Sequence, residues 1–345
     1  MNHTKTIIVS PSGKFYGSEQ VLFDFLTETR NTYTVYLPLS DKLHKKLVLQ
    51  NKHRVRVFVS LKKFYLKIFL QLLLGKINAV YSNEGGHIRY LKVLARVFPR
   101  AKFIIHIRII EDTDSRRIGI LPNNMVLLSI SDYITGLITH NEKSIKTIYD
   151  PYILRCNQQM VMDTGGKKIR AGIIGRVTET KGVNAIQSFC DFLENNYVTD
   201  IEMHFFGDVE QKIPSVSTFV EKSRKYRHVV VQFHGFKDNK KDLYDSIHIV
   251  LHFNKVEPLG RIFFESLDYG LPFIGFNEGG IGEIAKVLHL EDCMINDSIN
   301  WERELYRKIL NLKEALQKYS ESKEICNHTF SANKYCKTIE EIILV

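Results

Sequence analysis

The sequence has few cysteines and no long apolar run, and these two absences exclude broad classes of protein. Its 345 residues include five widely separated cysteines, none of them in a CxxC pair. Such a set predicts neither a zinc site nor a disulfide framework, and it favours a reducing cytoplasm. No window reaches the roughly 18 apolar residues of a membrane-spanning helix. The start, MNHTKTIIVS, also lacks the basic and apolar regions of a secretory signal, so we expect a cytoplasmic protein.

Acidic residues are nearly missing from one segment of the chain. The net charge is +10, and residues 41–76 hold ten Lys or Arg and a single acid, Asp41. This segment alone supplies +9, so the remainder is close to neutral and the basic surface is local. A nucleic-acid-binding protein would more often spread its charge along a groove. Nucleic acid is therefore not an expected partner, although binding through 41–76 stays open as an alternative.

Part of this segment has the pattern of a basic amphipathic helix. In LKKFYLKIFLQLLL, residues 61–74, Lys63 and Lys67 fall on one helical face, and apolar residues cover most of the remainder. One interpretation is a helix that packs on its own sheet and carries lysines on its outer rim. The other is peripheral docking on an anionic membrane surface through 41–76.

Apolar, β-branched runs alternate with helical stretches along the whole chain, which is typical of βαβ units with parallel sheets. The predicted strands of the first half are 6–10, 33–38, 54–60, 79–82, 102–107 and 125–130, with helices at about 18–29, 61–75 and 86–98. The pattern restarts with strands at 169–175, 201–207, 229–235, 247–253 and 272–276, and helices at about 182–195, 214–226, 258–269 and 280–288.

We therefore predict an α/β protein with two Rossmann-like, doubly wound domains, at 1–160 and 161–325. The stretch 150–168, with Pro151 and the Gly165–Gly166 pair, is the predicted linker. A C-terminal helix at 326–345 is expected to pack back toward the first domain. Ligands of such domains bind beyond the carboxyl ends of the strands, here in a cleft between the two halves.

Two glutamates with seven residues between them mark a candidate ligand site, in VEPLGRIFFESLDYGLPFIGFNEGGIGEI at 256–284. A helix from about 258 to 269 would place Glu257 at its mouth, Glu265 about two turns inside, and the amides of 259–261 around an anion. A carboxylate can also accept hydrogen bonds from both ribose hydroxyls. A phosphate at the helix mouth, a ribose on one carboxylate and a sugar near the other would together make a sugar nucleotide. Alternatively, Glu265 pairs with Arg261 on a solvated helix face.

A second motif, GIIGRVTETKG at 172–182, places two cations in the loop after a predicted strand. Arg176 and Lys181 suit a diphosphate, because arginine can bind phosphate oxygens as a bidentate fork. Alternatively, both are ordinary loop cations. Their position at the carboxyl end of the second domain's first strand favours the diphosphate.

Taken together, GRVTETKG and, about 75 residues later, EPLGRIFFESLDYGLPFIGFNEGGIGEI resemble the retaining nucleotide-sugar glycosyltransferases of family 4. These enzymes have the GT-B fold, with two Rossmann-like domains that face each other across a cleft. The resemblance covers most of the second domain. The first domain is similar more loosely, in GSEQVL, YSN, HIRI and SISDYI.

The resemblance implies roles for individual residues. Arg176 and Lys181 would hold the donor diphosphate, Glu257 would contact the donor sugar near the reacting carbon, and Glu265 would bind the ribose. His106 would face the donor sugar, unless it is a structural histidine. The catalytic set is thus His106, Glu257, Arg176 and Lys181. The remaining donor-binding positions are Gly17, Leu259, Gly260, Arg261, Gly279 and Gly280. No metal or cofactor is expected.

These observations predict a retaining glycosyltransferase that moves a sugar from a nucleotide-sugar donor to a glycan or lipid-linked acceptor. The first domain would bind the acceptor. Bacterial surface polysaccharide assembly, at the inner face of the cytoplasmic membrane, is the expected setting. A nucleotide-sugar epimerase of similar fold is an alternative enzyme, but the Arg-Lys pair and the paired glutamates suit it less well.

Overall fold

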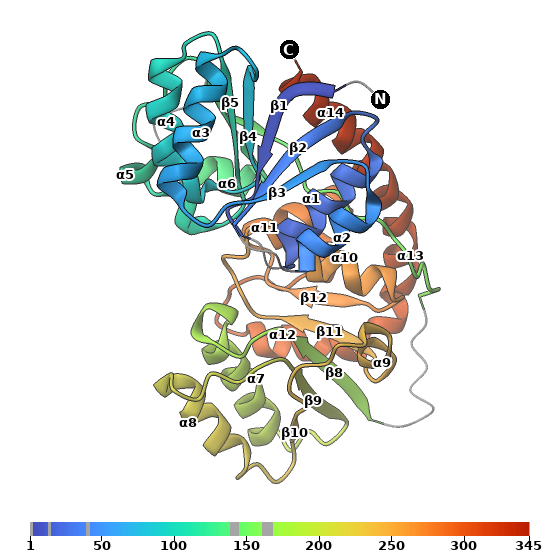
Figure 1. Cartoon of the computed structure of the whole chain (residues 1–345). Helices are drawn as coiled ribbons and strands as arrows, with labels where there is room; N and C mark the ends of the chain where they lie inside the picture. The colour runs from blue at the N-terminus through green and yellow to red at the C-terminus, as the bar shows by residue number, and fades with distance from the viewer. Residues whose placement is uncertain (1–2, 13–14, 39–41, 139–144, 161–167, 345) are drawn as a thin grey trace. The chain divides into compact units, whose positions relative to one another are not determined.

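The computed structural model describes residues 3–12, 15–38, 42–138, 145–160 and 168–344. Asp41 and the predicted Gly165–Gly166 pair lie outside the described residues. The chain forms two compact units, one of Met1–Ile153 with Phe330–Val345, the other of Leu154–Thr329. Each unit contains one parallel sheet with helices packed on it (Figure 1).

The sheet of the first unit has seven parallel strands in the order β3-β2-β1-β4-β5-β6-β7. The strands are β1 (His3–Val9), β2 (Thr32–Leu37), β3 (Arg54–Val57), β4 (Ala79–Ser82), β5 (Lys102–Ile107), β6 (Met125–Ser129) and β7 (Ile145–Thr147). β3 ends earlier than predicted because Ser60 caps the next helix, accepting a hydrogen bond from the Lys63 amide. β7 was not predicted, since a three-residue IKT strand has no apolar run.

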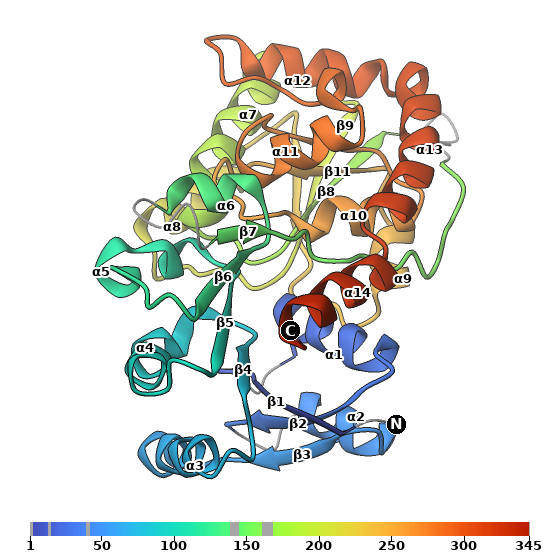
Figure 2. The same ribbon diagram turned by 90° about the horizontal axis from the view of Figure 1, so that it is seen from above.

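Helices cover both faces of this sheet (Figure 2). On one face lie α1 (Gly17–Glu28), α2 (Lys42–Gln50) and α14 (Ala332–Ile343), and on the other α3 (Leu61–Leu73) and α4 (Ile88–Val97). The shorter helices are η1 (Gly85–His87), η2 (Ile110–Thr113), α5 (Ser115–Ile118) and α6 (Asp132–Leu137). Phe25 of α1 and Ile339 of α14 pack in one apolar core above Val35 and Ile104 of the sheet. The last helix of the chain thus belongs to the core of the first unit.

The second unit has a five-stranded parallel sheet in the order β10-β9-β8-β11-β12. Its strands are β8 (Ile169–Ile174), β9 (Ile201–Phe206), β10 (Val230–Phe233), β11 (Ile249–His252) and β12 (Phe273–Gly275). Its helices are η4 (Glu179–Lys181), α7 (Val183–Asn195), α8 (Pro214–Ser223), α9 (Lys240–Asp245), α10 (Arg261–Asp268), α11 (Gly279–Val287), η5 (Glu291–Cys293), α12 (Trp301–Leu310) and α13 (Leu312–Thr329). α7, α8 and α12 share one apolar core with the sheet, in which Phe189 and Trp301 pack against each other.

The alternation of strands and helices therefore follows the predicted one, and all the described strand pairs are parallel. In the described part of the chain, no helix combines the length and the hydropathy that a bilayer span requires. Because parallel strands end at one edge of a sheet, the loops after β8, β11 and β12 meet at the carboxyl edge of the second sheet.

Candidate active site

Two neighbouring strands of the second unit end beside predicted site residues. β8 and β11 pair with each other, and they end at Ile174 and His252. The loop after β8 carries Lys181 in η4, and the loop after β11 carries Glu257. The sheet therefore brings together two residues that are 76 positions apart in the sequence.

The Glu257 carboxylate is the centre of this cluster. Lys181 Nζ donates a hydrogen bond to Glu257 Oε2 over 2.7 Å, and Asn254 Nδ2 donates to the same oxygen over 2.8 Å. His252 Nε2 lies 3.4 Å from that oxygen. Within the described residues, the carboxylate contacts all involve Oε2, so Oε1 can accept a hydrogen bond from a ligand hydroxyl.

The surroundings of Glu257 keep it ionised. Burial by itself would raise the pKa of this carboxyl. The His252 imidazole, 3.4 Å away, and the positive charge of Lys181 outweigh burial and hold the pKa of Glu257 well below its usual range. A permanent carboxylate next to an ammonium group gives this loop a fixed dipole at the sheet edge.

The helix that follows Glu257 begins later than predicted. α10 starts at Arg261, whereas the sequence pattern placed its start at residue 258. Gly260 precedes it with φ of 87°, a left-handed conformation that glycine adopts without steric cost. The chain turns at Gly260, and only then does the helix begin. Glu265 consequently lies about one turn into α10, not two.

The predicted glycine pair packs directly on the loop that carries Glu257. The amide of Gly280 donates to the backbone oxygen of Glu257 over 2.8 Å. A Cβ added to Gly280 would lie 2.5 Å from the Pro258 oxygen, so only glycine permits this approach. Gly279, with φ of 57°, begins α11 beside the same loop, and Leu259 is buried. This packing positions the Glu257 loop.

Both oxygens of Glu265 are engaged by α9, a helix that the sequence pattern did not predict. Lys240 Nζ donates to Glu265 Oε1 over 2.8 Å, and the Tyr244 hydroxyl donates to Oε2 over 3.0 Å. Tyr244 is buried and stacks on Tyr269 with ring centroids 4.3 Å apart. α9 was missed because its six residues are too few for a recognisable helical period.

The described contacts of Arg176 do not include any residue of the Glu257 cluster. Its side chain is 70% exposed, and Nη1 lies 3.0 Å from Glu210 Oε1. No hydrogen bond or ion pair in the described part of the chain joins Arg176 to Lys181 or to Glu257. A surface pair of this kind contributes little stability, so Glu210 can release Arg176 at small cost. Its predicted role toward a diphosphate stays a prediction.

In the first unit, His106 lies near the end of the predicted strand β5 but is fully buried. The Tyr81 hydroxyl lies 3.0 Å from His106 Nδ1, and Arg108 Nη2 lies 3.3 Å from the same nitrogen. Tyr335 of α14 stacks on the ring. Burial and the Arg108 charge hold the pKa of His106 well below its usual range, so the imidazole is neutral at pH 7. These contacts match those of a structural histidine, and its predicted catalytic role stays a prediction.

Arg108 connects this histidine to a buried ion pair. Its guanidinium is bonded to Asp150, and Nε donates to the Asn83 backbone oxygen over 2.9 Å. Nη2 also donates to the Tyr335 hydroxyl over 3.1 Å. Gly17, the remaining predicted position in this unit, is the first residue of α1.

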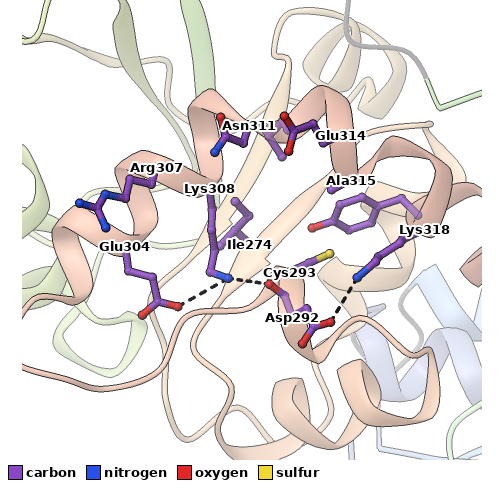
Figure 3. Close-up of a pocket in the computed structure, with 12 residues that line it drawn as sticks. Ile274, Asp292, Cys293, Glu304, Arg307, Lys308, Asn311, Glu314, Ala315 and Lys318 are labelled. Atoms are coloured by element: carbon purple, nitrogen blue, oxygen red, sulfur yellow. Dashed lines mark hydrogen bonds and ion pairs between the residues drawn. The ribbon is translucent and has the colours of Figure 1, made fainter.

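A cavity of about 490 Å³ in the second unit lies away from these residues (Figure 3). Helices α12 and α13 and the η5 turn line it, and none of the predicted site residues does. Lys308 and Lys318 both reach Asp292, at its backbone oxygen and its carboxylate respectively. Because both ammonium groups have partners within the wall, this cavity is a weaker candidate site than the Glu257 cluster.

Residues 161–323 match the family model described as "Glycosyl transferases group 1". The structure is similar to Anabaena HepE in complex with UDP and glucose, at 17% identity over 98% of this chain and 99% of HepE, with a TM-score of 0.73. It is also similar to the apo lipopolysaccharide outer core galactosyltransferase WaaB, at 12% identity over 98% of both chains, with a TM-score of 0.68.

The catalytic domain of starch synthase IV from Arabidopsis thaliana, bound to ADP and acarbose, has the same fold. Its identity is 10% over 99% of both chains, and the TM-score is 0.67. No curated protein sequence matches the chain significantly. At such identities the structural likeness shows the fold alone. The match over 161–323 and the two parallel-sheet domains confirm the predictions of a GT-B fold and of a glycosyltransferase.

Proposed function

Because the chain is a glycosyltransferase with the GT-B fold, we propose that it transfers a sugar from a nucleotide-sugar donor to a glycan or lipid-linked acceptor, with retention of the anomeric configuration. The observation that supports this proposal best is the Lys181–Glu257 pair at the carboxyl edge of the second sheet. The proposed setting is bacterial surface polysaccharide assembly. That the reaction needs no metal or cofactor stays a prediction.

The cluster suits the charge changes of this reaction. As the sugar leaves the donor, negative charge grows on the nucleoside diphosphate, and an ammonium group there stabilises the transition state more than the ground state. Lys181 is the proposed cation, with Arg176 as a second one after it leaves Glu210. Oε1 of Glu257 would accept a hydrogen bond from a sugar hydroxyl. Glu265 would accept hydrogen bonds from the ribose.

Uridine is the nucleoside that we propose for the donor. HepE, the neighbour with a TM-score of 0.73, has structures with UDP and with UDP-glucose at 17% identity. The low identity supports a choice of nucleotides for testing and leaves the sugar open. UDP-glucose is therefore the donor to test before other nucleotide sugars.

Thermal stabilisation by a panel of nucleoside diphosphates and their sugar conjugates is the measurement that tests the donor site. A nucleotide at 100 times its dissociation constant adds about 2.7 kcal/mol to the free energy of unfolding. We expect UDP and its conjugates to raise the melting temperature of the wild type. Lys181→Ala and Glu265→Ala should lose that rise, whereas Lys308→Ala, a lysine of the separate cavity, should keep it.

Two results would contradict the proposal. If no nucleotide shifts the melting temperature, the donor site is wrong. If a bound nucleotide sugar changes its sugar configuration and is never transferred to an acceptor, the chain works as an epimerase.

Tyr244→Phe is expected to lower the ratio of the dissociation constants of 2′-deoxy-UDP and UDP about fivefold. This is the effect of losing one hydrogen bond. The Tyr244 hydroxyl orients the carboxylate that would bind the ribose, and its ring keeps its stack on Tyr269 in the variant. Binding of both nucleotides by calorimetry gives the ratio. Tyr226→Phe, which removes a hydroxyl bonded to Asp191, should leave the ratio unchanged. An unchanged ratio in Tyr244→Phe would remove Tyr244 from ribose recognition.

We also propose a cytoplasmic location at the inner face of the membrane. The basic segment 41–76 supports it, because each Lys or Arg near an anionic leaflet adds to membrane attraction.

A further inference from the structure

Helices α3 and α4 form a layer with an unusual outer surface on the first unit. The two helices lie side by side on one face of the sheet (Figures 1 and 2). Tyr65 stacks on Tyr90 with ring centroids 4.6 Å apart, and Phe69 meets Phe98 at 5.1 Å. Phe64 and Ile68 are buried on the inner side. The sheet-facing side of α3 is thus buried by packing on the sheet and on α4. The outer side of α3 does not take part in this packing.

The outer side carries large apolar residues where a solvated helix would carry polar ones. Each of six side chains there is between 47% and 64% exposed. We call them the α3–α4 ridge: Leu66, Leu70, Leu73, Leu74, Val93 and Val97. Leu66, Leu70 and Leu73 recur at helical spacing on one stripe of α3. Large exposed apolar side chains that gather on two neighbouring helices are typical of a contact with a protein or a membrane.

The charges around the ridge are almost all positive. Residues 61–100 contain eight Lys or Arg and a single acid, Glu84. That acid is only partly exposed and accepts a hydrogen bond from Ser18 over 2.5 Å. The exposed cations are Lys62, Lys63, Lys67, Lys76, Arg89, Arg96 and Arg100. A second copy of the chain would place these cations against one another, whereas an anionic surface complements them.

A groove continues the ridge at the ends of the two helices. Its volume is about 470 Å³, and it lies between the last turns of α3 and α4. Leu73 and Val97 belong to both ridge and groove, and Leu72, Ile77 and Phe98 add further apolar walls. The groove ends near Asn78 and Ala101, at the amino ends of β4 and β5. It is therefore at the edge of the sheet opposite to the carboxyl ends of the strands.

We propose that the α3–α4 ridge inserts into a bilayer rich in anionic phospholipid, with the surrounding cations on the headgroups and an acyl chain entering the groove. This inference names the surface that would contact the membrane, and it takes from the proposed function only the location at the inner face of the membrane. The sequence pattern assigned this contact to the charges of the basic segment 41–76. The structure adds a hydrophobic component from two helices, which salt does not screen.

Co-sedimentation with vesicles of phosphatidylcholine and phosphatidylglycerol tests the proposal at low and at high salt. The Leu66→Ser, Leu70→Ser, Leu73→Ser triple variant is expected to lower the partition coefficient at least about tenfold at both salt concentrations. Lys62→Glu, Lys63→Glu, Lys67→Glu should lower it chiefly at low salt. Ile299→Ser changes a 96% exposed apolar side chain of the second unit, outside 41–76, and should have no effect.

Unchanged vesicle binding by the triple serine variant would overturn the proposal. A wild-type dimer in solution that the same variant dissociates would overturn it too, because the ridge would then be a contact between copies. The rise in melting temperature with UDP, measured on the same proteins, tests the donor site independently of membrane binding. Leucine-dependent vesicle binding without any nucleotide effect would support the ridge and contradict the proposed function.

Discussion

Replacing Glu257 with Gln is expected to lower the rate of sugar transfer by at least about 100-fold while the fold stays intact. The variant removes the charge that Lys181, Asn254 and His252 surround, and the ammonium group loses its fixed partner. Loss of one preorganised polar group at a site of developing charge costs about 10² to 10³ in rate. Release of nucleoside diphosphate from the donor measures the effect.

Glu210→Gln is the matched control for this variant. It makes the same chemical change in a second glutamate that pairs with a cation, but on the exposed Arg176–Glu210 pair. We expect its rate to stay within about twofold of the wild type, since exposed pairs contribute little. Equal losses in the two variants, or full activity in Glu257→Gln, would exclude Glu257 from the reaction.

The pH dependence of this site has a defined sign. The pKa of Glu257 is depressed in the folded protein. The contribution of its negative charge to stability and to the reaction is therefore fully present above the ordinary pKa of a glutamate, and it is lost only as the pH falls through the depressed pKa. Wild-type activity should therefore show no loss from Glu257 protonation down to about pH 5. Lys181→Ala removes one influence that depresses this pKa, so the Glu257 carboxyl of the nucleotide-free variant, followed by NMR, should titrate at a higher pH than in the wild type.

Asp150→Ala is expected to lower the free energy of unfolding of the first unit by about 3–5 kcal/mol. Asp150 and Arg108 are both buried, and arginine cannot release its proton, so the variant leaves an uncompensated buried charge. Arg108 also contacts His106 and Tyr335, which ties the effect to α14. Urea denaturation followed by circular dichroism measures the shift.

The control for this prediction is Asp245→Ala. It breaks the Lys241–Asp245 pair, which is exposed on α9, and should cost no more than about 0.5 kcal/mol. A similarly small loss in Asp150→Ala would mean that water reaches Arg108 and that the buried pair does not hold α14 in place.

The parts of the candidate site that were predictable from the sequence lie on local motifs. Gly260, Gly279 and Gly280 stand in short stretches whose turns require glycine, so the spacing alone indicated a tightly packed loop. Lys181 and Glu257 each follow a recognisable apolar strand, and the parallel arrangement predicts that such loops meet. The start of α10 was wrong because a left-handed residue at Gly260 delays the helix, and propensity does not reveal that conformation.

Other features depend on contacts between distant segments. Lys240 and Tyr244 reach Glu265 from a six-residue helix, and Asn254 and His252 reach Glu257 from the end of a strand. Polar residues directly at the carboxyl end of β11 were an available signal for the second pair. For Lys240 and Tyr244 the sequence contains no such signal, because tertiary packing decides which residue 20 or more positions away becomes the partner of Glu265.

The sequence by itself determined the α/β alternation, the two parallel sheets and the loops that carry Lys181 and Glu257, because hydrophobic period and turn residues are local properties. Only the tertiary structure decided that His106 is enclosed by Tyr335 from the last helix, and that the leucines of α3 remain exposed beside α4. Burial is the reason for both. Whether a side chain meets water depends on which distant elements cover it, and no local pattern contains that information.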